Sequence, residues 1–343
     1  MGLLMIVFLS SCYISFSPQT ASAAIFDVTA YGAKGDWNTD DTKAFIQAWA
    51  DLCRDKSSNP TLVIPPRNSF LIGPVTFSGP CNFPAVHVQQ VATKKCERPM
   101  ALHFNRCNGL RLNGTTHADS PSLHISIVNC QNIDLGHLRI LAPADSPNTD
   151  GIDLSASSQI NIHDSSIHIG DDCVAINGGI YDINVTRVFC GPGHGISLGE
   201  NGGYDTVEKV HVRNCNITGT TNGLRIKTVP GGTGYARGIV FQDIHLVNVE
   251  NPIIIDQHYW TNAENSFCQA PPTDPAVQVS DVVYMNIHGS SASKQAITLN
   301  CSGKFNCTGI HTYQVGITGA DDFLYCKNAQ GKFLYTNPTV RCS

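Results

Sequence analysis

The chain has 343 residues, a formal net charge of −5 at pH 7 and only 14% charged side chains, whereas soluble domains usually contain about 25%. The negative net charge argues against a nucleic-acid partner, although it leaves room for a local basic groove that binds an anionic ligand. After the N-terminus no stretch approaches the roughly 18 uncharged apolar residues that a membrane span requires, so we expect no membrane partner.

Residues 1–23 are typical of a secretory signal peptide, because they contain an apolar core and end in the small-residue sequence Ala21-Ser22-Ala23. The mature chain is expected to start near Ala24, and residues 24–343 are expected to form one secreted domain at the cell wall or in the extracellular space. Five glycosylation sequons fit a secreted glycoprotein: Asn113, Asn184, Asn216, Asn300 and Asn306.

The cysteine count supports the same compartment. Of the 14 cysteines only Cys12 lies in the expected signal peptide, which leaves 13. In an oxidising compartment most of them should form disulfides, and the odd number leaves at least one thiol. Neither a C-x-x-C pair nor a clustered His/Cys spacing is present, so we expect no metal site and no cofactor.

The stretch TDDTKAFIQAWADLC, residues 39–53, predicts an amphipathic helix. Phe45, Ala48, Trp49 and Leu52 recur at helical spacing, and acidic residues stand near the start of the helix. We interpret this helix as a cap with no catalytic role.

From residue 130 onward the chain repeats a short phrase of alternating aliphatic residues. Successive phrases lie 23 to 29 residues apart, with one larger gap of 43, and each is followed by Asn, Gly or Ser. Each unit therefore consists of a few short strands joined by turns, without room for crossover helices. The first aliphatic positions are Ile133, Ile160, Ile183, Val210, Ile239 and Val282.

A coil of this size cannot bury its own inner face, but stacked coils about 4.8 Å apart bury these faces continuously. The repeat thus predicts an all-β, single-domain, right-handed parallel β-helix with an N-terminal capping helix. The alternative is a β-sandwich, which would show shorter and more hairpin-like spacing.

Four polar motifs fall on consecutive units of this repeat. They are SPNTDGI (146–152), GDDC (170–173), GPGHGISLG (191–199) and RIKT (225–228). Stacking brings residues one repeat apart to within one or two strand spacings, so the four motifs are expected to form one contiguous patch.

In this order the motifs NTD, DD, GHG and RIK resemble those of the polygalacturonases, the glycoside hydrolases that cleave pectin. The resemblance runs from FDVTAYGAKGDWNTDDTKAF at 26–45 through NPIIIDQHY at 251–259 to the last cysteines. It implies cleavage of α-1,4-galacturonosyl bonds in polygalacturonate by an inverting mechanism.

Glycoside hydrolysis needs one protonated carboxyl to donate to the leaving oxygen and one carboxylate to activate water. Crowding keeps one acid protonated and another ionised, because carboxyl groups at close range cannot all ionise easily. The resemblance implies that Asp171 donates the proton, while Asp150 and Asp172 position and deprotonate water. Neighbours in a regular strand face opposite sides, so Asp171 and Asp172 can share a site only if the backbone bulges or turns near Gly170.

Other motif residues are candidates for contacts with the sugar. His194, between two glycines, is expected to tune the acids or touch the substrate. Arg225 and Lys227 lie two apart on a strand and hence on one face, where two cations suit a carboxylate. Asn148 is expected to form hydrogen bonds near Asp150, and Tyr259 resembles the substrate-contacting tyrosine of the family.

A disulfide between Cys173 and Cys190 is predicted, because Cys173 follows the acid pair and Cys190 opens the GPGHG turn one coil later. Such a link would lock the two catalytic coils together. The family resemblance implies three further pairs: Cys53 with Cys81, Cys301 with Cys307, and Cys326 with Cys342.

The chain departs from the family pattern in two places. Residues 82–122 are short by about one coil and lack the Gly-rich phrase and tryptophans that the family normally carries there. Trp260 stands where related plant sequences usually have a cysteine, so Cys268 is expected to lack its partner.

Several alternatives stay open at this point. A pectate lyase would need a calcium site and a basic proton abstractor, and a rhamnogalacturonan hydrolase would share much of the fold. An inactive wall protein would bind polygalacturonate without releasing reducing ends. GPGHGISLG resembles exo-acting pollen members, which favours exo over endo attack only mildly, and we expect a monomer.

Overall fold

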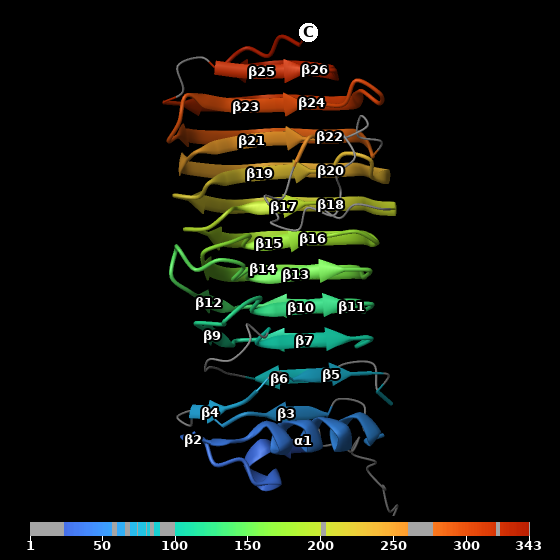
Figure 1. The fold of residues 1–343 in the computed structure, drawn as a ribbon, viewed down its shortest axis with the longest axis vertical. Coiled ribbons are helices and arrows are strands. Elements are labelled where there is room, and N and C mark those ends of the chain that lie inside the picture. Colours follow the sequence, from blue (N-terminus) through green and yellow to red (C-terminus); the bar gives the residue numbers. More distant parts are fainter. Residues whose placement is uncertain are drawn as a thin grey trace, which may run out of the picture.

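The computed structural model describes residues 24–56, 60–65, 69–73, 75–79, 81–82, 86–89, 100–199, 204–259, 277–319 and 323–342. Their strands stack as successive rungs from the helix α1 (Thr42–Arg54) at one end to β25 and β26 at the other (Figure 1). The expected signal peptide, Trp260 and Cys268 lie outside the described residues. Among the described residues, no helix is long and apolar enough to cross a membrane.

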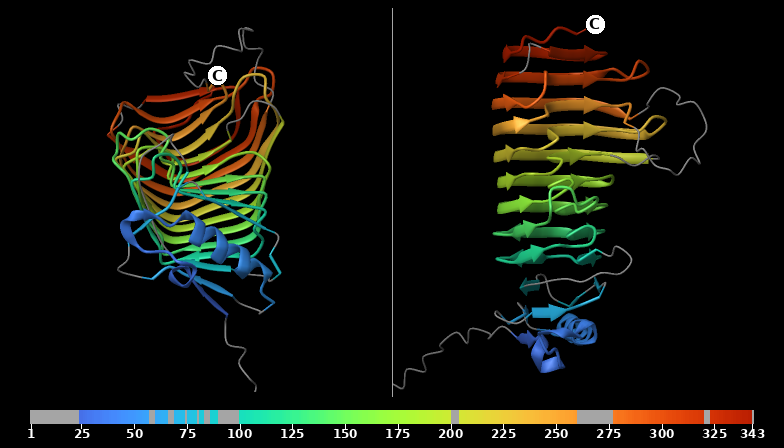
Figure 2. Two further views of the ribbon diagram at one scale, coloured as in Figure 1. Left: turned by 60° about the horizontal axis from the view of Figure 1, so that its bottom comes forward. Right: turned by 60° about the vertical axis from the view of Figure 1, so that its left-hand side comes forward.

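Two parallel sheets form the walls of the stack, and Figure 2 shows their strands running side by side. Sheet 1 has fourteen strands: β1 (Ile25–Asp27), β3 (Thr61–Val63), β6 (Val86–Gln89), β8 (Leu110–Asn113), β9 (Thr116–Ala118), β11 (Gln131–Gly136), β12 (Arg139–Leu141), β14 (Ser158–His168), β16 (Ile180–Cys190), β18 (Tyr204–Thr218), β20 (Thr233–Val249), β22 (Gln278–Ser291), β24 (Cys307–Thr318) and β26 (Ala329–Asn337). Sheet 2 has ten: β5 (Thr76–Ser78), β7 (Leu102–Asn105), β10 (Ile125–Val128), β13 (Ile152–Ser155), β15 (Val174–Ile176), β17 (Ile196–Leu198), β19 (Asn222–Lys227), β21 (Asn251–Asp256), β23 (Gln295–Asn300) and β25 (Phe323–Lys327). A small parallel pair, β2 (Asp36–Asp40) and β4 (Ser69–Leu71), and a 3₁₀ turn at Val28–Tyr31 complete the set.

The repeat in the sequence corresponds to the register in which the strands of sheet 1 pair. The six aliphatic positions that defined it pair in sequence order, from Ile133 with Ile160 to Ile239 with Val282. The parallel β-helix is therefore confirmed, and the β-sandwich is wrong because every described pairing between strands is parallel.

The interior consists of columns of aliphatic side chains that run along the stack. One column of sheet 2 has no member more than 1% exposed, and the burial of each such side chain contributes roughly 1.5–3 kcal/mol. Its members in order are Ile125, Ile152, Val174, Ile196, Leu224, Ile253 and Ile297.

The long strands of sheet 1 contain residues with positive φ, and one such position matches from rung to rung. Asn and Asp tolerate positive φ better than most other side chains. Asp164 (φ 50°), Asn214 (φ 53°), Asp243 (φ 54°) and Asn286 (φ 55°) occupy this place in four of the rungs. Arg187 and Gln314 hold the same position in two further rungs, so the backbone conformation recurs with and without Asn or Asp.

The predicted capping helix is α1, which covers the open end of the core. Phe45 and Trp49 face inward and pack on Phe70 and Phe77, with ring centroids 5.5 and 4.8 Å apart. The carboxylate of Asp41 accepts the N–H groups of residues 34 and 35. It therefore ties the preceding loop to the start of the helix.

The structure contains the four disulfides that the sequence predicted: Cys53–Cys81, Cys173–Cys190, Cys301–Cys307 and Cys326–Cys342. Among the described residues three buried cysteines are free: Cys107, Cys130 and Cys215. The Cys173–Cys190 bond connects the turn before β15 with the end of β16, and so links two neighbouring rungs at the acid pair.

The stack continues through the region where a coil was expected to be missing. β6 pairs with β3 on one side and with β8 on the other. In sheet 2, β7 likewise pairs with both β5 and β10. The described strands of this region therefore keep the core continuous up to the rungs that carry the polar motifs.

The buried hydroxyl of Tyr284 lowers the stability of the core. Tyr284 is fully buried and stacks on Phe241 at 5.0 Å, and its hydroxyl has no hydrogen-bond partner among the described residues. An unpaired buried hydroxyl costs free energy that a phenylalanine does not incur. We therefore expect Tyr284→Phe to raise the free energy of unfolding by about 1 kcal/mol. Urea unfolding followed by fluorescence would measure it, and a lower midpoint for the variant would contradict it.

Candidate active site

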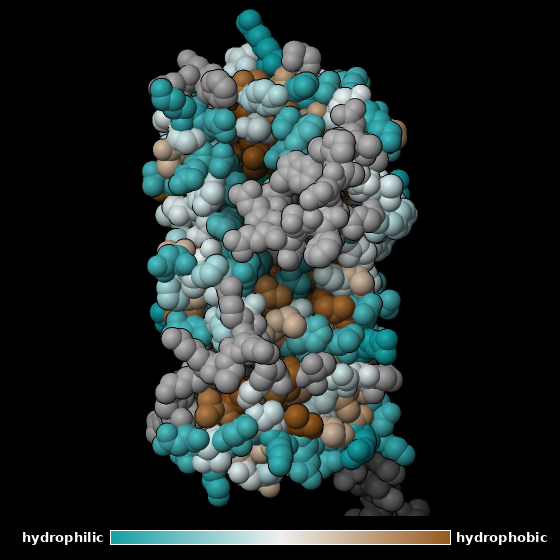
Figure 3. Space-filling model, in the orientation of Figure 1, coloured by the Kyte–Doolittle hydropathy of each residue, from teal (hydrophilic) through white to brown (hydrophobic). Residues whose placement is uncertain are grey.

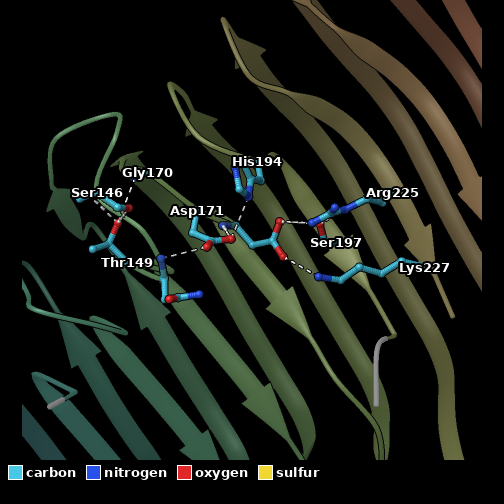
Figure 4. A network of polar contacts seen from close by, with 10 residues as sticks. Ser146, Thr149, Gly170, Asp171, His194, Ser197, Arg225 and Lys227 are labelled. Carbon is cyan, nitrogen blue, oxygen red and sulfur yellow. Dashed lines mark hydrogen bonds and ion pairs between the residues drawn. The ribbon is translucent and has the colours of Figure 1, made fainter. Parts of the chain in front are cut away.

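Three of the polar motifs occupy turns that lead into neighbouring strands of sheet 2. Asp150 precedes β13, Asp171 and Asp172 precede β15, and His194 precedes β17. Arg225 and Lys227 lie within β19, the next strand. Because β13, β15, β17 and β19 are successive neighbours, the four motifs meet on the outer side of one wall (Figure 4).

The acid pair lies in a turn and not in a strand. β14 ends at His168 and β15 begins at Val174, so Asp171 and Asp172 escape the alternation that would place them on opposite faces. Gly170 allows this turn, because a Cβ at this position would lie 2.1 Å from the carbonyl oxygen of Ser146. The Thr149 hydroxyl accepts the N–H of Gly170 at 3.1 Å and ties the turn to the Asp150 loop.

Asp171 is held by one side chain and two backbone groups. His194 Nδ1 lies 2.9 Å from Oδ1, and the N–H groups of Asp172 and Asn148 donate to the carboxylate at 2.9 and 3.0 Å. Burial acts to raise the pKa of Asp171, but the hydrogen bond and charge of His194 and these N–H groups outweigh it and lower the pKa. The hydrogen bond to Asp171 in turn raises the pKa of His194. The pair is therefore most stable with Asp171 as a carboxylate and the proton on His194 as an imidazolium.

The glycines around His194 bring its turn close to the acids. Gly193 has φ of 140°, and a Cβ there would lie 2.6 Å from the carbonyl oxygen of Asp171. The backbone N–H of His194 donates to this same oxygen at 2.6 Å. Any larger residue at 193 would push the imidazole away from the Asp171 carboxylate.

Asp172 points toward β17 and β19 and is 1% exposed. Its carboxylate accepts hydrogen bonds from Ser197 Oγ at 2.7 Å, Arg225 Nη2 at 2.8 Å and Lys227 Nζ at 3.1 Å. Two cations therefore contact one buried carboxylate here. Ile226, between them, is fully buried in the core.

Tyr259 covers this cationic pair from the following rung. Its ring centroid lies 5.6 Å from Cζ of Arg225 and 5.2 Å from Nζ of Lys227, within the range of cation–π attraction. The backbone N–H of Tyr259 donates to the carbonyl oxygen of Thr228 at 3.2 Å, which fixes the residue beside β19.

Asp150 differs from Asp172 because no cationic side chain of the described residues pairs with it. Burial, together with the charges of Asp171 and Asp172, raises the pKa of Asp150 to about 8. The cluster thus holds a proton on Asp150 near neutral pH, while Asp171 is ionised. Burial first, and the neighbouring carboxylates second, thus separate the pKa values of the acids. The sequence placed the proton on Asp171, whereas the free site holds it on Asp150.

Within the described residues, one group has the spacing of a metal site. Single ligand atoms of Asp171, Asp172 and His194 lie within 4.8 Å of one another. The two cationic side chains that contact Asp172 oppose the binding of a positive ion there. The geometry therefore favours acid–base chemistry over metal binding.

Two residues that support the site were not singled out from the sequence. Ser197 bonds both Asp172 and Arg225, the latter at 2.9 Å, and Thr149 joins the two acidic turns. Ser197 could have been found, since it stands between the inward-facing Ile196 and Leu198 and so must face the same side as Arg225. Thr149 lies in an irregular loop, where the sequence carries no such periodicity.

A family model described as glycosyl hydrolases family 28 matches residues 67–338. The chain belongs to this family. A protein named probable polygalacturonase from Arabidopsis thaliana is 40% identical over 94% of this chain and 81% of its own length. A polygalacturonase from Malus domestica is 37% identical over 85% and 74%, and an exopolygalacturonase from Arabidopsis thaliana 32% over 87% and 80%.

Solved structures share the fold of this family 28 chain at low sequence identity. An endo-xylogalacturonan hydrolase from Aspergillus tubingensis superposes with a TM-score of 0.71 at 19% identity, covering 93% of this chain and 99% of its own. A polygalacturonase from Erwinia carotovora ssp. carotovora gives 0.68 at 19% identity, covering 95% and 98%. These similarities support the parallel β-helix independently of the motifs.

Proposed function

We propose that this family 28 chain hydrolyses α-1,4-galacturonosyl bonds of polygalacturonate, with inversion at the cleaved sugar. The observation that carries the proposal is three crowded acids beside two cationic side chains on one outer wall. The acids supply acid–base catalysis, and the positive charge suits a substrate with a carboxylate on every sugar. Relatives named polygalacturonases, at 37–40% identity, support the same substrate.

Arg225, Lys227 and Tyr259 are proposed to receive the carboxylate and the ring of a sugar next to the cleaved bond. Both cations project from β19 beside Asp172, and the ring of Tyr259 lies over both of them. Asn148, exposed at the rim beside Asp171, is proposed to donate a hydrogen bond to the sugar through its side chain.

In the proposed mechanism Asp171 protonates the leaving oxygen, while Asp150 and Asp172 orient and deprotonate the attacking water. His194 keeps a proton next to Asp171 and positions its carboxyl through the 2.9 Å contact. The free site holds the proton on Asp150 instead. The acids titrate together, so the active form differs from the free form in which acid of the cluster holds the proton.

The pH dependence follows from this single proton. Above about pH 8 the proton on Asp150 is lost, and no acid remains to protonate the leaving oxygen. Below the lowered pKa of Asp171 a second proton binds, so that Asp150 and Asp171 are both protonated and Asp150 cannot act as a base. We therefore expect kcat/KM on polygalacturonate to follow a bell whose upper limb lies near pH 8 and whose lower limb lies below the ordinary pKa of an aspartate. A rate that still rises beyond pH 9 would contradict this assignment.

One incubation with polygalacturonate separates the proposal from its rivals. A hydrolase releases reducing ends without ultraviolet absorption, whereas a lyase also leaves an absorbing unsaturated sugar. A wall-binding protein would retain the polymer and release nothing. Proton NMR of the first product should show the inverted anomer, and a retained anomer would rule out the proposed mechanism.

The location, the oligomeric state and the mode of attack are proposed as well. We propose that the chain acts as a secreted monomer at the cell wall, in keeping with its plant relatives and its four disulfides. Relatives include proteins named polygalacturonase and one named exopolygalacturonase, so the products must decide the mode of attack. Monomer alone would mean exo cleavage, and a ladder of oligomers would mean endo cleavage.

A further inference from the structure

The outer face of sheet 2 continues past the candidate active site to the last rung of the stack (Figure 1). Strands β19, β21, β23 and β25 pair in that order, so the outward positions of β19 recur on every later rung. The first outward column is Arg225, Ile254, Thr298 and Tyr325. The second is Lys227, Asp256, Asn300 and Lys327.

The second column begins and ends with a lysine. Between them Asn300 donates its side-chain N–H to Asp256 at 3.0 Å, so these two side chains engage each other. Lys327 is therefore the next cation after Lys227 in this column. It lies three rungs away, which is about 14 Å at the usual spacing of parallel strands.

Tyr325 and Lys327 lie two positions apart on one face of β25, so an aromatic ring and a cation again stand on the outer side of this sheet, as Tyr259 does with Arg225 and Lys227. Tyr325 is 39% exposed and Lys327 is exposed as well. Cys326, between them, is buried and bonded to Cys342. The disulfide thus holds this edge strand with both flanking side chains directed outward.

We propose that Tyr325 and Lys327 form a distal subsite, which binds a carboxylate-bearing sugar of a chain that reaches beyond the catalytic rungs. The inference rests on the proposed function, since it concerns the same polyuronate substrate. A linear polyanion lying along the second column meets Lys227 near the cleaved bond and Lys327 three rungs on. The tyrosine ring offers its apolar face to the sugar, and the ammonium group balances the carboxylate.

The test is Lys327→Ala assayed on galacturonate oligomers of increasing length. We expect KM to rise about two- to fivefold for oligomers long enough to reach the last rung, as for a solvent-accessible ion pair. KM for the dimer and trimer should not change, and the difference should shrink at high salt. Lys327→Arg should largely restore the KM of the long substrates.

Lys332 provides a matched control, because it is an exposed lysine of the same final coil but belongs to β26 of sheet 1. Lys332→Ala should leave KM unchanged at every length. An equal KM for wild type and Lys327→Ala on long oligomers would overturn the distal subsite, and so would an equal rise at all lengths.

The distal subsite and the proposed function fail in different ways. If the wild-type protein releases no reducing ends, the proposed hydrolysis is wrong. Calorimetric binding of polygalacturonate to wild type and Lys327→Ala still tests the subsite in that case, because it needs no turnover. Weaker binding of the long polymer by the variant would support the subsite, and identical binding would refute it.

Discussion

Replacement of Asp171 by Asn is expected to lower kcat on polygalacturonate by about 10²–10⁴-fold, the usual contribution of a general acid. The variant keeps the shape of the side chain and the N–H contacts from Asn148 and Asp172, so the loss should be in kcat more than in KM. Steady-state rates of reducing-end release measure it. A variant that retains wild-type kcat would show that Asp171 is not the acid.

A second substrate distinguishes the acid from the base, which is needed because the free site holds its proton on Asp150. A galacturonide with a nitrophenol leaving group requires little protonation. Asp171→Asn should therefore recover most of its relative activity on this substrate, whereas Asp150→Asn should remain inactive because water activation is still missing. If Asp150→Asn is the variant that recovers, the two residues exchange roles.

Replacement of Asp172 by Ala is expected to destabilise the protein by about 3–5 kcal/mol, because it leaves two buried cations without their carboxylate. The side chains of Arg225 and Lys227 are only 10% and 5% exposed, so water cannot easily replace the lost partner. Denaturant unfolding, monitored by tryptophan fluorescence, measures the change. A midpoint equal to that of the wild type would show that these cations find another partner.

The matched control for this variant is Glu208→Ala. Glu208 pairs with Arg237 at 3.1 Å, but the Arg237 side chain is 46% exposed, and exposed pairs contribute little. Its loss should move the unfolding midpoint far less than the loss of Asp172. Similar shifts in the two variants would mean that burial does not govern the strength of the Asp172 contacts.

The sequence alone determined the architecture of this protein. Each coil must bury one aliphatic face on its neighbours, so the recurrence of Ile133, Ile160 and Ile183 specifies both the strands and their register. The helix at 42–54 followed in the same way from the spacing of Phe45 and Trp49. The order of the four polar motifs along these coils also determined that their residues would meet.

Only the tertiary structure decided what the charged residues contact. The sequence predicted that Arg225 and Lys227 bind a carboxylate of the substrate. In the structure both contact Asp172, a residue more than 50 positions earlier in the chain. The location of the proton was likewise hidden, because the pKa of Asp150 depends on its burial and on the two carboxylates of the next coil. Periodicity fixes which way a strand residue points, but these acids lie in turns. Their directions and electrostatics arise from contacts between coils, which no local pattern in the sequence encodes.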